Sequence, residues 1–111
     1  MKPYIVRNKE FIKFFCQLSP SSKCRLITNL DKNHIDTISE ICKNFLENNL
    51  TQNPKVIQKL RKSRNEIRSL SLKKTALFKK KKILQSRRGG AILSILLPLA
   101  ASLISSIFTR R

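Results

Sequence analysis

The sequence has no tryptophan, one tyrosine and only two glycines, Gly89 and Gly90, which stand side by side. Its three cysteines, Cys16, Cys24 and Cys42, are an odd number and include no Cys-x-x-Cys pair. This pattern argues against a disulfide framework and a zinc site, and it favours a reducing compartment. We therefore expect each cysteine to be a small buried apolar residue.

Groups suited to catalysis are also scarce. Six acidic residues are scattered along the 111-residue chain, and there is a single histidine, His34. No cysteine has an evident general base near it in the sequence, and nucleophilic catalysis needs such a pair. We expect no catalytic residue, no metal site and no cofactor, and hence a protein that is not an enzyme.

Strand patterns are poor, because β-branched residues are never grouped in alternating runs. The sequence therefore predicts an all-α protein. Residues 1–13 alternate charged and apolar side chains without an apolar core, so we expect no secretory signal peptide.

Helical periodicity is clear in the first 50 residues. Asn8 is placed to cap a helix over 9–18, and Ser19 and Pro20 suit the N-cap and first position of the next. That second helix is expected to bury Cys24 and Ile27. A small helical bundle is the natural way to join such segments into one core.

The strongest amphipathic pattern covers residues 34–47, for which Asp31 or Asn33 is the expected cap. Its apolar side chains recur at three- and four-residue spacing, at Ile35, Ile38, Ile41, Cys42, Phe45 and Leu46. We interpret nearly every apolar residue before position 50 as part of the core of the bundle.

Charge is concentrated in residues 55–90, which hold fourteen Lys and Arg against the single acid Glu66, while the whole chain carries +18. Pro54 is expected to open one long helix with a narrow apolar stripe and a wide cationic face. Beyond it, closely spaced like charges disfavour a free helix. Residues 73–88 are therefore expected to order only on a polyanion, so that the protein is partly disordered alone.

A cationic segment of this density predicts binding to double-stranded DNA, because neutralised phosphates release condensed counterions. Only Phe78 in this region could stack on a base, and no Asn or Gln is set on a recognition face, so we expect no sequence specificity. The predicted nucleic-acid-binding residues are Lys55, Lys59, Arg61, Lys62, Arg64, Arg68, Lys73, Lys74, Lys79, Lys80, Lys81, Lys82, Arg87 and Arg88.

Residues 91–108 are uncharged, and their length is near the threshold of about 20 residues for a membrane span. Pro98 and four serines weaken a simple span, so both membrane contact and burial against a protein partner stay open. The residues expected to make this contact are Ile92, Leu93, Ile95, Leu96, Leu97, Leu99, Leu103, Ile104, Ile107 and Phe108.

The change from cationic to apolar is abrupt and falls at the two glycines. We interpret this junction as an exposed linker in which Gly89, Gly90 and Ala91 form a candidate cleavage site; a helix C-cap glycine is the alternative. The expected organisation is a helical bundle (1–50), a basic nucleic-acid-binding helix and tail (51–88), a Gly-Gly junction (89–90) and an apolar C-terminal segment (91–111), itself a helix.

The run Arg87-Arg88-Gly89-Gly90, with Ile92-Leu93 and then residues 96–101 (Leu-Leu-Pro-Leu-Ala-Ala) after it, resembles adenovirus core protein X, the precursor of the DNA-condensing mu peptide. It is also similar to small proteins of adenovirus-related Maverick/Polinton elements and adintoviruses. The resemblance implies a virion core protein that condenses DNA and is present in the host nucleus during assembly. It further implies contact with other virion proteins and cleavage after Gly90 by a viral maturation protease.

Two other function classes fit parts of the sequence. A membrane-active or tail-anchored protein would place residues 91–108 in lipid and the cations on anionic headgroups. A cellular RNA-binding or ribosome-associated protein would account for the charge but not for the apolar segment. The DNA-condensing hypothesis accounts for both the cationic block and its Gly-Gly boundary.

Overall fold

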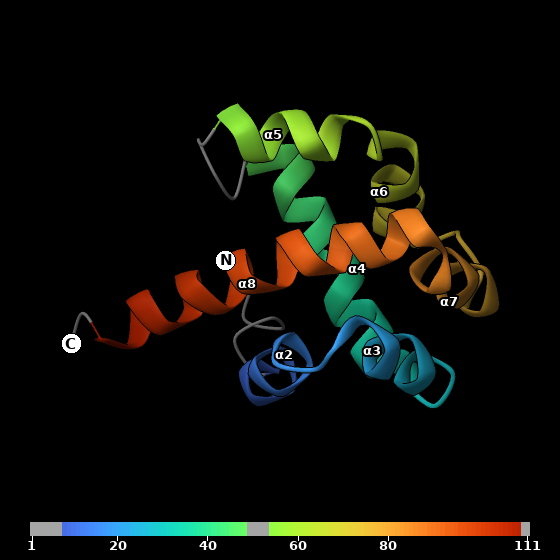
Figure 1. Ribbon diagram of the computed structural model, residues 1–111, viewed down its shortest axis with the longest axis horizontal. Coiled ribbons are helices and arrows are strands. Elements are labelled where there is room, and N and C mark those ends of the chain that lie inside the picture. The colour runs from blue at the N-terminus through green and yellow to red at the C-terminus, as the bar shows by residue number, and fades with distance from the viewer. Residues whose placement is uncertain (1–7, 49–53, 110–111) are drawn as a thin grey trace.

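The computed structural model describes residues 8–48 and 54–109, with side chains described for 8–47 and 54–102 (Figure 1). These residues contain helices and no strand, which confirms the predicted all-α class. The helices are α2 (Lys9–Cys16), α3 (Pro20–Ile27), α4 (Lys32–Asn48), α5 (Pro54–Arg61), α6 (Arg64–Ser71), α7 (Leu77–Gln85) and α8 (Arg87–Thr109).

The starts of α3 and α4 follow the expected capping chemistry, but the prediction that Asn8 caps α2 was wrong. The Asn8 side chain makes no capping hydrogen bond to α2, and its oxygen accepts from the side-chain amide of Asn33 at 3.1 Å. The Ser19 side chain accepts a hydrogen bond from the Ser22 backbone N–H at 3.3 Å, with Pro20 in the first helical turn. At α4, the carboxylate of Asp31 accepts from the backbone N–H of His34 at 2.9 Å. Both caps satisfy a donor that a helix start leaves without an intrahelical partner.

Helix α4 crosses the molecule behind the others in Figure 1, and its predicted apolar stripe is buried. Ile35, Ile38, Ile41 and Cys42 are each at most 2% exposed. Helix α3 buries Ile27 as expected, but Cys24 is exposed, so the prediction that all three cysteines are buried was wrong. Cys24 lies on the side of α3 that packs near the end of α7, at the rim of the core.

The single long helix expected from Pro54 onwards is broken into α5 and α6. The break falls at Lys62 and Ser63, where the Ser63 N–H donates to the carbonyl of Leu60 in a turn. The turn redirects the chain so that α6 packs against α4 and buries Ile67. Periodicity within one helix could not reveal this change of direction.

Residues 73–88 contain the ordered helix α7, contrary to the expectation that they order only on a polyanion. Leu84 is 1% exposed in the core, and Gln85 ties α7 to α3. Its side-chain amide donates to the carbonyl of Cys24 at 3.0 Å and to the hydroxyl of Thr28 at 2.7 Å. These contacts offset the repulsion between neighbouring lysines that the sequence suggested would prevent a helix.

Helix α8 runs through the middle of the molecule in Figure 1 and packs against α2 and α7. The expected separate C-terminal segment is therefore part of the main core, to which each described helix contributes. The buried α8 residues are Ile92, Leu93, Leu96, Leu97 and Ala100, each at most 2% exposed. The predicted boundaries at 50, 88 and 90 do not separate independent cores.

Candidate nucleic-acid interface

The cationic residues of 55–90 lie on α5, α6, α7, the first turn of α8 and the loops between them. Twelve of the fourteen side chains are exposed. They are Lys55, Lys59, Arg61, Lys62, Arg64, Arg68, Lys73, Lys74, Lys79, Lys82, Arg87 and Arg88. In Figure 1, α5, α6 and α7 follow one another around the top and right, with α7 next to α3.

Lys80 is an exception among the predicted binding residues. Its side chain is only 4% exposed, and its ammonium donates to the hydroxyl of Ser39 on α4 at 2.9 Å. Burial lowers the pKa of Lys80 below its usual 10.5, while the negative charge of Asp36 opposes that shift. Placing Lys80 on an open DNA-binding surface was therefore wrong.

Lys81 is half-buried and donates to the carbonyl of Thr28 at 3.1 Å, so it contributes to the packing of α7 beside α3. Arg88 also has a structural contact. Its guanidinium donates to the carbonyl of Lys62 at 3.1 Å and to the carboxylate of Glu66 at 3.3 Å. Glu66, the single acid in 55–90, is thus paired within the basic region, which leaves the surrounding cations in excess.

The two glycines lie in the first turn of α8, where an exposed linker was expected. Ser86 precedes them and acts as the helix cap: its hydroxyl accepts from the Gly89 N–H at 3.1 Å, and its carbonyl accepts from the Gly90 N–H at 2.9 Å. Gly89 is buried against the end of α7. The alternative of a C-cap glycine is not seen either, because Ser86 occupies the C-cap of α7.

The candidate cleavage site at Gly89, Gly90 and Ala91 is consequently helical. A protease cleft accepts an extended strand, so a cut after Gly90 would require the first turn of α8 to unwind. Cleavage after Gly90 stays a prediction, and it requires this local unwinding of α8.

The predicted membrane or partner residues divide into three groups. Ile92, Leu93, Leu96 and Leu97 are already buried within this chain, whereas Ile95 and Leu99 are partly buried against the core. The side chains of Leu103, Ile104, Ile107 and Phe108 lie outside the described residues. In the described part of the chain, no helix is both long and apolar enough to cross a membrane.

Sequence reasoning missed a polar face on α4. Lys32, Asp36, Ser39 and Lys43 recur at three- and four-residue spacing, and they line a cavity together with residues of the α6–α7 region. The spacing was available in the sequence, but the partner segment that closes the cavity was not. Elsewhere, among the described residues, no group of three or more His, Cys, Asp or Glu side chains forms a metal-ligand cluster.

The thiols provide a direct check on the packing of α3 against α7 and of α4 in the core. Cys42 is fully buried, and burial raises its pKa to about 12, whereas Cys24 is exposed. At pH 8 we expect a disulfide reagent to modify the exposed Cys24 rapidly and the buried Cys42 only on unfolding, because raising the pKa of Cys42 from 9.0 to about 12 leaves about a thousandfold less of its thiolate.

The measurement is the rate of thiol modification followed by absorbance. With the half-buried Cys16 changed to serine in every sample, Cys24→Ser should remove the fast phase and Cys42→Ala should keep it. Equal rates for the two thiols in the folded protein would contradict the packing described here.

No family model, curated protein or solved structure matches this chain.

Proposed function

We propose that this protein is a non-enzymatic viral core protein that binds and condenses double-stranded DNA without sequence specificity. The observation that carries the proposal is the exposure of twelve cations within residues 55–90, on helices held in place by the core and on the loops between them. Phosphate neutralisation by Lys and Arg supplies most of non-specific DNA affinity, and it needs no contact with bases.

The virion assignment rests on the resemblance of residues 87–101 to adenovirus core protein X. It carries three further proposals: location in the virion core and the host nucleus during assembly, contact with other virion proteins, and processing after Gly90 by a viral maturation protease. Mass spectrometry of purified particles tests the processing step, and finding intact chain alone would contradict it.

The test of DNA binding is the affinity for unrelated duplexes across a salt series. If about half of the cations in 55–90 contact phosphates, log K should fall against log salt with a slope of about −6, at about −0.9 per contact. The slope should be equal for all sequences.

Two double variants remove one exposed lysine and one exposed arginine each. Lys59→Gln with Arg68→Gln lies in α5 and α6, while Lys13→Gln with Arg25→Gln lies in the α2–α3 region and serves as the control. The first pair should make the slope shallower by about 1.8, from two lost contacts of about 0.9 each, and the second should leave it nearly unchanged.

A shallow slope with no binding near physiological salt would overturn the proposal. The membrane-active alternative would then take its place if the protein floats with anionic vesicles in the absence of nucleic acid.

A further inference from the structure

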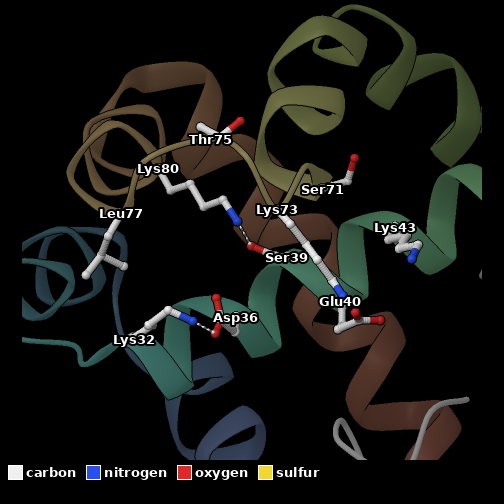
Figure 2. A pocket seen from close by; sticks show the side chains of 10 residues that line it. All are labelled: Lys32, Asp36, Ser39, Glu40, Lys43, Ser71, Lys73, Thr75, Leu77 and Lys80. Carbon is white, nitrogen blue, oxygen red and sulfur yellow. Dashed lines mark hydrogen bonds and ion pairs between the residues drawn. The ribbon is translucent and has the colours of Figure 1, made fainter.

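A solvent-open cavity of about 460 Å³, lined mainly by polar and charged residues, lies between α4, the end of α6, the loop after it and α7 (Figure 2). This volume is in the usual range for small-ligand sites, about 300–1,000 Å³. Figure 2 shows Lys80 reaching from α7 to Ser39 on α4 and Lys73 reaching from the loop toward Glu40, with Asp36 beside Lys32. None of the exposed Lys and Arg residues of α5 and α6 lines this cavity.

Lys80 places a buried ammonium against α4. Three N–H bonds point from it, and among the described residues only the Ser39 hydroxyl, at 2.9 Å, accepts one of them. Ser39 is held in turn, because its own hydroxyl donates to the carbonyl of Ile35 at 3.1 Å. Burying a charged donor with hydrogen bonds unmade is costly, so an acceptor entering the cavity would be stabilised there.

The charge of Lys80 also has no carboxylate of its own. Asp36 is the acidic residue that acts most on the pKa of Lys80, but Asp36 pairs with Lys32 at 2.8 Å. The effect of burial on the pKa of Lys80 outweighs that of Asp36, which is the sign of a cation only partly compensated by its neighbours.

The opening of the cavity supplies further donors. The Thr75 hydroxyl and the Lys73 ammonium both line it, and neither side chain has a hydrogen bond or ion pair to the described part of the chain. Together with the buried Lys80 ammonium, they give the lining of the cavity three donor groups that an oxyanion can use.

The balance of charges around the cavity sets the class of ligand. Four lysines line it, Lys32, Lys43, Lys73 and Lys80, against the carboxylates of Asp36 and Glu40, which leaves an excess of two positive charges. A phosphomonoester carries about −1.5 to −2 at neutral pH and offers three acceptor oxygens. An internal phosphodiester of a nucleic acid carries one negative charge, which matches an excess of two positive charges less well.

We propose that this cavity binds a phosphomonoester or diphosphate group, with Lys80 and Ser39 on the inner wall and Lys73 and Thr75 at the opening. Two sources share this chemistry: a free small phosphate compound, or the phosphorylated 5′ end of a nucleic-acid strand. The site is additional to non-specific DNA binding and does not depend on it.

The first experiment titrates the full-length protein with inorganic diphosphate in a calorimeter at physiological salt. We expect saturable binding of one equivalent. Lys80→Met keeps the aliphatic stem and removes the charge, and it should weaken binding about tenfold or more, as expected for a lost charge-assisted hydrogen bond. Circular dichroism checks whether Lys80→Met keeps the helix content of the unchanged protein.

The matched pair Lys73→Gln and Lys79→Gln tests the cavity proposal even if the Lys80→Met variant is unstable. Both side chains are exposed and both changes remove one charge, but Lys79 does not line the cavity. Lys73→Gln should weaken diphosphate binding several-fold, with Lys79→Gln close to the unchanged protein. Equal effects of the two, or several weak equivalents per chain, would overturn the proposal.

Competition with trinucleotides distinguishes the two sources. Displacement of diphosphate by a 5′-phosphorylated trinucleotide but not by its unphosphorylated form identifies a strand end as the ligand. Displacement by neither identifies a free small phosphate compound, and equal displacement by both would contradict a site for a terminal phosphate.

The diphosphate titration and the duplex salt series, both run on the unchanged protein, separate the two proposals. Absence of diphosphate binding with a steep DNA salt slope removes only the cavity proposal. Stoichiometric diphosphate binding with a shallow slope removes only the DNA proposal.

Discussion

Gly89→Ala is expected to destabilise the protein by more than about 3 kcal/mol, at the upper end of single-residue effects. A Cβ at this position would lie within 2.7 Å of the Leu84 Cα and would also meet the carbonyl of Ile83. Both obstacles are backbone atoms, so no side-chain rotation relieves the overlap. Helix α8 would have to move away from α7, which would open the core around Leu84.

The neighbouring glycine provides a matched control. A Cβ at Gly90 would have no heavy atom within 4 Å, and Gly90 has helical geometry. Gly90→Ala should therefore be neutral or stabilising by about 0.5–1 kcal/mol, because alanine is the better helix former. Urea unfolding followed by circular dichroism measures both, and equal stabilities for the two variants would show that α7 and α8 do not pack as described.

Leu96→Ala is the second large expected effect, at about 2–5 kcal/mol of destabilisation. Leu96 is 2% exposed in the middle of α8, so its truncation leaves a cavity in the core shared by α2, α7 and α8. A C-terminal segment that was independent of the bundle would predict almost no effect on the stability of the remainder.

Phe78→Ala is the control for Leu96→Ala. It removes a larger apolar side chain, but one that is 68% exposed on α7. Its cost should stay within about 0.5 kcal/mol, as for other surface changes. A comparable loss from both variants in the same urea experiment would contradict the assignment of α8 to the core.

Local chemistry in the first half of the chain made its structure predictable. The cap at Ser19, the proline after it and the apolar stripe of α4 depend on residues within a few positions of each other. The exposed state of most cations was predictable for the same reason, since a long charged side chain is rarely buried without a partner.

The errors share a different origin, because each depends on a contact distant in sequence. Lys80 is buried by Ser39, which lies 41 positions earlier, and no pattern around 79–82 indicates that partner. In the sequence, Gly89 marks a change in charge and in periodicity. In the structure, its lack of a side chain allows α8 to approach α7 closely. The polar cavity likewise joins one face of α4 to a loop more than 25 residues away.

The packing of α2 against α8 has a consequence for the order in which the protein forms. These helices, Lys9–Cys16 and Arg87–Thr109, are far apart along the chain, so their contact closes a long loop and raises the contact order of the fold. During synthesis the chain from α2 to α7 leaves the ribosome before the helix that completes its core. The nascent chain therefore carries its full polycationic segment with an open apolar face.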